Sequence, residues 1–243
     1  MENKEFKAIS GVELMMMEFP RQQYCVQDIL PDGLSILSSE NMDIAKSLAM
    51  DISLRVASGQ ELWDMESRKG AVLHLIHQDT LAVTRNQIMR MTRRIPDNLY
   101  IGVMTESSLP LAISAIPGFI EKHPDASLVV IELDDAVALV EGKLFATADT
   151  LLHYNRLKEM TEEYGIAVLV VLRQLSTTMR LFLENDEKPA CISDIIDSGF
   201  NMEQKWNNPY DAELHRSSRE FGNASWEIQY SKETHKWERK AEK

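Results

Sequence analysis

The stretch that decides the fold is IAVLVVL, residues 166–172, which follows Gly165 and contains no polar side chain. It is far shorter than the ~20 residues of a membrane-spanning helix, and it is too apolar for a strand with one face in water. Residues 71–76 (AVLHLI) and 128–133 (LVVIEL) have the same character, and stretches with helical spacing separate these runs. The alternation predicts an α/β protein whose mostly parallel central sheet carries helices on both faces.

Weaker patterns extend this prediction along the chain. We expect further strands at residues 35–38, 99–103 and 226–230, and helices at residues 44–58, 81–91, 111–121 and 149–164, the third interrupted by Pro117. Residues 184–219 are expected to form loops, and the charged tail from Lys232 is expected to fray. The predicted organisation is an N-terminal extension (residues 1–17), one large domain (residues 18–231) and a C-terminal tail (residues 232–243).

The net charge and the composition limit which partners and which cell compartment we expect for this protein. The chain has 243 residues and a formal net charge of −12, so a nucleic-acid partner would need a local basic patch against the overall field. The one basic cluster, Arg68, Lys69, Arg85, Arg90, Arg93 and Arg94, fits a solvated helix face or a DNA or nucleotide contact. Two cysteines, no apolar run that could span a membrane and no signal-peptide pattern lead us to expect a cytoplasmic protein.

Chemistry is expected where the first core strand meets its helix, because ligands of such sheets bind at the carboxyl ends of the strands. Residues 38–47 read SSENMDIAKS. A phosphate-binding loop needs a glycine, four residues, a second glycine, then lysine and serine or threonine. Lys46 and Ser47 stand at the lysine and hydroxyl positions, whereas Glu40 and Ala45 stand at the two glycine positions.

With this junction, the chain resembles the RepA-type, RecA-fold P-loop ATPases of plasmid, phage and bacterial replication, from about Glu18 to Glu238. The pieces that carry the resemblance are Glu18-Phe19-Pro20, ILPDGL at 29–34, Ala45-Lys46-Ser47, ASG at 57–59, GAVLHL at 70–75, LVVIE at 128–132, YGIAVLVV at 164–171 and Ser218-Arg219-Glu220. The resemblance implies a RecA-like P-loop NTPase fold that binds ATP with magnesium at the Lys46 junction.

The same resemblance assigns roles to residues that depart from the family pattern. The general-base position holds Gln78, whose amide cannot accept a proton from water, and the Walker B aspartate position holds Glu132. Arg173 and Gln174 replace the paired sensor histidines, and Arg219 is a possible phosphate or interface arginine.

Glu40 is the most damaging of these departures. A carboxylate ~4 Å from a phosphate repels it by about 4 kcal/mol at an effective dielectric constant of 20. We therefore expect ordinary ATP turnover to be lost, and we expect Lys46 to form an ion pair with Glu132.

Three functional readings remain open. The first is a catalytically inactive interaction or regulatory protein linked to DNA replication or mobile elements, with a protein partner or self-association. The second is an active ATPase or helicase-associated protein with an unconventional loop. The third is a protein that binds another anion or nucleotide through Lys46 and Ser47. No metal site is predicted, because the spacing of His74 and His77 places them on opposite faces of a strand.

Overall fold

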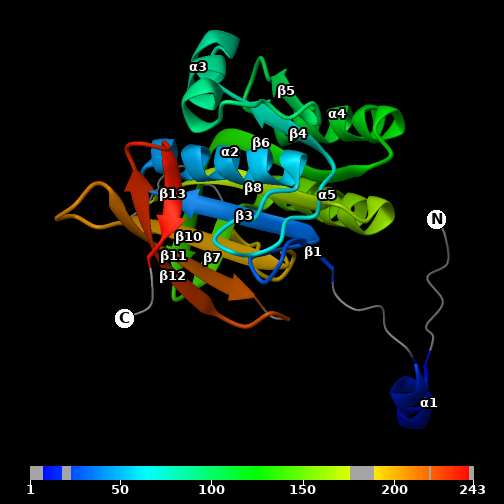
Figure 1. Ribbon diagram of the computed structural model, residues 1–243. Helices are drawn as coiled ribbons and strands as arrows, with labels where there is room; N and C mark the ends of the chain where they lie inside the picture. The colour runs from blue at the N-terminus through cyan, green and yellow to red at the C-terminus, as the bar shows by residue number, and fades with distance from the viewer. Residues whose placement is uncertain (1–7, 18–22, 176–188, 219, 241–243) are drawn as a thin grey trace.

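The computed structural model describes residues 8–17, 23–175, 189–218 and 220–240 (Figure 1). In chain order its elements are α1 (Gly11–Met16), β1 (Tyr24–Val26), β2 (Leu30–Pro31), β3 (Gly33–Ser39), α2 (Met42–Ser58), β4 (Ala71–Ile76), α3 (Leu81–Met91), β5 (Leu99–Val103), α4 (Leu109–Lys122), β6 (Ala126–Val140), β7 (Lys143–Thr147), the short 3-10 helix η1 (Ala148–Thr150), α5 (Leu151–Tyr164), β8 (Ala167–Leu175), β9 (Pro189–Cys191), β10 (Ser198–Gln204), β11 (Asp211–Ser218), β12 (Ala224–Ser231) and β13 (Lys236–Arg239).

One large sheet organises the molecule. Its strand order is β13-β12-β11-β10-β3-β8-β6-β4-β5, and β7 extends it by pairing with β6 and β9. Every neighbouring pair from β10 to β5 is parallel, whereas the pairs from β10 to β13 are antiparallel. The four strands predicted around residues 35–38, 71–76, 128–133 and 166–172 therefore lie side by side in one mostly parallel sheet, as expected.

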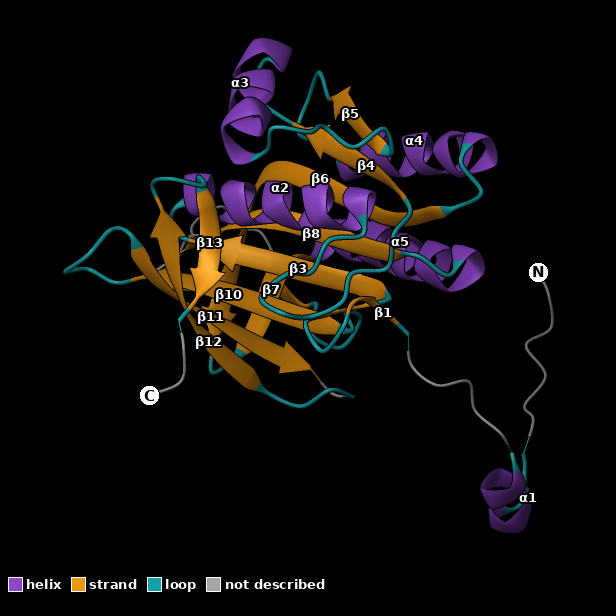
Figure 2. Ribbon diagram, viewed as in Figure 1, coloured by secondary structure: helices purple, strands orange, loops and turns teal. Residues whose placement is uncertain are grey.

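Helices cover both faces of this sheet (Figure 2). The central position of β8 between these two layers explains why its sequence is apolar throughout. Leu169 and Val171 point into the core beneath α2, while Val168 and Val170 point into the core formed with α4 and α5. Each of these side chains is at most 1% exposed. Both faces of the strand are buried, so no alternation of polar and apolar residues is left in its sequence.

The interruption predicted at Pro117 is wrong, because α4 continues through it from Leu109 to Lys122. Proline removes the hydrogen bond to the carbonyl of Ile113. The preceding turns nevertheless bury Ala112 and Ile116 completely, and Pro117 itself lies on the exposed side. Packing on the buried side holds the helix together despite the lost bond.

The expectation of loops over residues 184–219 is also wrong for most of the described part, which contains β9, β10 and β11. In β11, Ala212 and Leu214 are buried, and Arg216 occupies the third inward position. A charged residue at an inward position breaks the alternation of polar and apolar residues by which a strand is predicted. In the structure the Arg216 guanidinium donates hydrogen bonds to the carbonyls of Asp28 and Phe221. Such pairing makes a buried arginine tolerable.

The described part of the C-terminal tail does not fray as predicted, because residues 236–239 form β13 and pair with β12. The side chain of Trp237 is 1% exposed and packs into the core beneath α2. The buried tryptophan and the pairing with β12 hold this short charged strand against the sheet. Among the helices that the structure describes, none is long and apolar enough to cross a membrane.

Candidate functional site

The junction between β3 and α2 is shorter than a phosphate-binding loop. Strand β3 ends at Ser39 and α2 begins at Met42, so only Glu40 and Asn41 separate them. In a P-loop the glycine-rich segment lies between strand and helix, where its backbone N–H groups are free to wrap phosphate. Here residues 42–47 belong to the first turns of α2 instead.

Two backbone donors at this junction, the N–H groups of Asn41 and Asp43, are already bonded to side chains. The side chain of Asn41 caps α2 by accepting from the N–H of Asp43 at 3.1 Å, and the Ser39 hydroxyl accepts from the N–H of Asn41 at 3.2 Å. The Asn41 amide also donates to Gln204 on β10 at 3.2 Å. Asp43 places a carboxylate in the first turn, where it complements the positive end of the helix dipole.

The four residues at the phosphate-loop positions do not converge. Ala45 is 0% exposed in the core beneath α2, and Glu40 points to solvent. The Ser47 hydroxyl donates to the Ile44 carbonyl and accepts from Nε1 of Trp237, both at 2.8 Å. Of the four, Lys46 alone reaches the ends of the parallel strands.

The ammonium group of Lys46 lies among three acceptors, of which Glu132 belongs to β6, and His77 and Asp79 both follow β4. Its Nζ lies 3.3 Å from Glu132 Oε2 and 3.2 Å from Asp79 Oδ2, and it donates to the carbonyl of His77 at 3.2 Å. The predicted ion pair with Glu132 is therefore present. Burial alone would lower the pKa of Lys46, but Glu132 and Asp79 outweigh it and hold that pKa above its ordinary value.

A buried hydrogen-bond chain that the sequence did not reveal continues from Glu132. Its Oε1 lies 3.0 Å from Nε2 of His74, whose Nδ1 lies 2.9 Å from the hydroxyl of Ser53 on α2. A carboxylate only accepts hydrogen bonds, so Nε2 carries the proton. Burial by itself would raise the pKa of Glu132, but the hydrogen bond from His74 and the charge of Lys46 hold it below its ordinary value.

The remaining predicted site residues lie at the rim or elsewhere. Gln78, in a left-handed conformation with φ of 67°, donates to Asp134 Oδ2 at 2.7 Å. Arg173 Nη2 lies 3.8 Å from the other oxygen of Asp134. Gln174 instead accepts from the Ser38 hydroxyl at 3.4 Å, and Arg219 lies outside the described residues.

The space left at this junction does not fit ATP with magnesium. Its cavity holds about 90 Å³ and is lined by residues that include Lys46, Gln78, Glu132 and Arg173. Pockets for small ligands usually hold about 300–1,000 Å³. The Ser47 hydroxyl faces Trp237, and no group of His, Cys, Asp and Glu side chains in the described parts of the chain has the arrangement of a metal site.

The mostly parallel central sheet with helices on both faces (Figure 2) is the fold of the RecA-like P-loop NTPase class. A family model described as an AAA domain matches residues 3–173, well over half of the chain. The chain belongs to this AAA-domain family. Among curated proteins, none matches this sequence.

Proposed function

We propose that this chain is a catalytically inactive member of the AAA-domain family that works as an interaction or regulatory protein. One observation carries the proposal: α2 begins at Met42, so residues that would cradle phosphate are helical, and the N–H groups of Asn41 and Asp43 are already bonded to side chains. Hydrolysis also lacks its base, because Gln78 stands where the family resemblance expects a carboxylate.

Binding of ATP at this junction would require two unfavourable changes. The first turns of α2 would have to unwind, which would expose Ala45 and break the Asn41 cap. Lys46 would also have to leave Glu132, which is 3% exposed. Separating a buried ion pair costs about 3–5 kcal/mol, equivalent to more than a hundredfold in affinity.

The retained fold supports a role in protein association. A sheet with complete cores on both faces offers a stable scaffold without needing a nucleotide. The resemblance to RepA-type ATPases supports a partner among replication or mobile-element proteins, or a second copy of the chain. The net charge of −12 argues against the DNA backbone as the main partner.

Steady-state phosphate release and magnesium-dependent ATP binding by the purified protein test the proposal. We expect no turnover above background and no binding at millimolar ATP. Lys46→Ala is the control for contaminating ATPase, and Lys122→Ala, an exposed lysine at the end of α4, is the matched variant. Turnover near 1 s⁻¹, in the ordinary enzyme range, that is lost in Lys46→Ala and kept in Lys122→Ala would overturn the proposal.

A further inference from the structure

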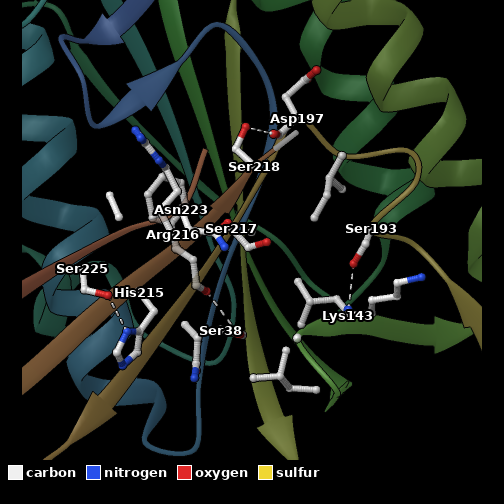
Figure 3. A pocket seen from close by; sticks show the side chains of 18 of the residues that line it. Ser38, Lys143, Ser193, Asp197, His215, Arg216, Ser217, Ser218, Asn223 and Ser225 are labelled. Atoms are coloured by element: carbon white, nitrogen blue, oxygen red, sulfur yellow. Dashed lines mark hydrogen bonds between the residues drawn. The ribbon is translucent and has the colours of Figure 1, made fainter. Parts of the chain in front are cut away.

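The strand order that runs from β13 to β5 ends in two strands of opposite character. At one end β13, Lys236–Arg239, reads KWER, and charges of this kind keep an edge strand from pairing with another chain. The strands next to it are polar as well, and they line a cavity of about 660 Å³ in which Nδ1 of His215 lies 2.8 Å from the Ser225 hydroxyl (Figure 3). At the other end β5, residues 99–103, reads LYIGV and carries no charge.

The outer edge of β5 presents backbone groups that have no partner strand. Among the described strands β5 pairs with β4 alone, and Figure 1 shows it at the outer side of the sheet between α3 and α4. The carbonyl of Asn98 accepts a hydrogen bond from β4, and the N–H of Met104 donates one to it. Because bonding to one neighbour alternates along a parallel strand, the N–H and C=O groups of Ile101 and Val103 point away from β4.

The side chains of β5 are apolar and only partly covered. Val103 is 50% exposed, and Leu99 and Ile101 are half-buried beside the cluster that joins α2 to α3. On the opposite face Tyr100 packs against α4. The segment that follows, residues 107–120, contains no charged residue and forms most of α4. An uncharged edge strand with free backbone groups is a template for pairing with another chain.

The sequence of β5 is complementary to itself about its central residue. An antiparallel pair of two β5 strands centred on Ile101 places this residue opposite its own copy, so that the outward N–H and C=O groups of the two copies bond to each other. In that register Leu99 lies opposite Val103, and Tyr100 lies opposite Gly102. An aromatic ring opposite an edge glycine covers the backbone that the glycine leaves bare.

The charges at the two ends of β5 also fit an antiparallel arrangement. Glu106 follows the strand, whereas Arg93 and Arg94 precede it, and all three side chains are exposed and form no ion pair within the described residues. The loop before the strand also holds Asp97, and its net charge stays positive. Antiparallel pairing brings Glu106 of each copy to the end where the other copy carries the arginines, whereas parallel pairing would bring like charges together.

We propose that β5 pairs antiparallel with β5 of a second copy of this chain, so that the two sheets continue into one another across a two-fold axis. This inference rests on the proposed function, because it names the partner of a protein that acts by association. A two-fold contact uses the same surface on both copies and therefore stops at a dimer. A head-to-tail contact would instead continue into rings or filaments.

Sedimentation velocity of the full-length protein at about 5–200 µM tests this proposal. We expect a monomer–dimer equilibrium without larger species. Val103→Lys places a charge on the free edge and should raise the dissociation constant of the dimer at least about tenfold, while urea unfolding stays unchanged because this side chain is 50% exposed. Val12→Lys makes the same change on α1, at a side chain 68% exposed, and should leave the dissociation constant within about twofold.

Cysteine substitution tests the register of the two strands. Ile101→Cys places two thiols at directly opposite positions, where the Cα atoms lie about 5.5 Å apart and within the range of a disulfide. In the same register the two copies of Val103→Cys lie about 14 Å apart, beyond that range. We expect copper–phenanthroline to cross-link Ile101→Cys and not Val103→Cys, although Val103 is the more exposed residue. The unsubstituted protein, with Cys25 and Cys191, sets the background.

Charge reversal separates a lost contact from a lost fold. Glu106→Arg and Arg94→Glu should each weaken the dimer about threefold, because each brings like charges together across the two-fold axis. The double variant should recover the affinity of the unsubstituted protein within about twofold, a recovery that a misfolded variant would not show.

Several results would overturn the proposal: a monomer at about 200 µM, a dimer that Val103→Lys leaves intact, or larger species in place of a dimer. An equal loss in Val12→Lys would assign the association to α1, and equal cross-linking of the two cysteine variants would exclude the register. Phosphate release measured on the same samples separates this inference from the proposed function. A monomer without turnover refutes only the β5 pairing, whereas turnover refutes the proposed function and leaves the dimer measurement standing.

Discussion

Replacement of Lys46 by alanine distinguishes a structural lysine from a nucleotide-binding one. The ammonium group lies 3.3 Å from Glu132, which corresponds to a Coulomb attraction of about 5 kcal/mol at an effective dielectric constant of 20. Removing one partner of a buried pair usually costs about 3–5 kcal/mol. The Lys46 side chain is 17% exposed, so in the alanine variant water can partly solvate the Glu132 carboxylate and reduce this cost. We expect Lys46→Ala to lower the free energy of unfolding by about 2–3 kcal/mol at pH 7.

The pH dependence of this loss has a defined sign. The pKa of Glu132 is lowered in the folded protein, so its contribution to stability is present above the unfolded value and is lost as pH falls through the folded value. Without Lys46 the pKa of Glu132 rises, and protonation relieves the uncompensated charge. The difference in unfolding free energy between the two proteins should therefore be largest near neutral pH and should shrink below about pH 4.

Urea unfolding followed by tryptophan fluorescence at pH 7, 5 and 3 measures the effect, since the chain has four tryptophans. Lys122→Ala is the control for loss of an exposed lysine. Glu132→Gln and the double variant Lys46→Ala/Glu132→Gln complete a double-mutant cycle. The coupling energy between Lys46 and Glu132 in this cycle should exceed about 1 kcal/mol. A loss under about 0.5 kcal/mol for Lys46→Ala at pH 7, the size of an ordinary surface effect, would refute the structural role.

Three further predictions concern the same junction. His74→Leu should destabilise the fold by about 1–3 kcal/mol in thermal unfolding, because Glu132 Oε1 loses its buried donor; unchanged stability would show that the hydrogen bond has no net value. Trp237→Ala should cost about 3–5 kcal/mol in urea unfolding, whereas Trp206→Ala, at a side chain 97% exposed, should cost under about 0.5; equal effects would mean that β13 is not anchored. Gln78→Glu should leave phosphate release at background, because a restored carboxylate does not restore the loop; turnover in this variant would contradict the importance of the α2 start.

The sequence predicted the parallel core because its signal is local. The run at residues 166–172 is apolar at every position, and this is the direct consequence of burial on both faces of β8. Gly59 and Gly165 end α2 and α5 in left-handed conformations, so the ends of these helices could also be predicted from single residues. The ion pair of Lys46 with Glu132 was predicted from the resemblance to P-loop ATPases, whose geometry brings these two junctions together, and from the opposite charges of the two residues.

The features that the sequence did not reveal depend on contacts between distant residues. Trp237 donates to Ser47 across 190 positions of the chain, and no local pattern records that contact. His74 interrupts an apolar strand, and its bonds to Ser53 and Glu132 become visible only once α2, β4 and β6 are packed together. The start of α2 was similarly hidden, because the Asn41 cap competes with a loop that the spacing of Lys46 and Ser47 suggested.

The residues that stand at the phosphate-loop positions stabilise the first turns of α2. Alanine at position 45 favours a helix over glycine by about 1 kcal/mol, and its methyl group is fully buried beneath α2. Met42 and Ile44, in what would be the loop, are buried as well and add apolar surface to the sheet contact. A glycine at position 45 would therefore weaken α2 before it created any cradle, and Lys46 would still be held by Glu132 and Asp79. Each change that would move this junction toward a phosphate loop is therefore expected to lower stability when it is made alone, because the residues present pack α2 against the sheet.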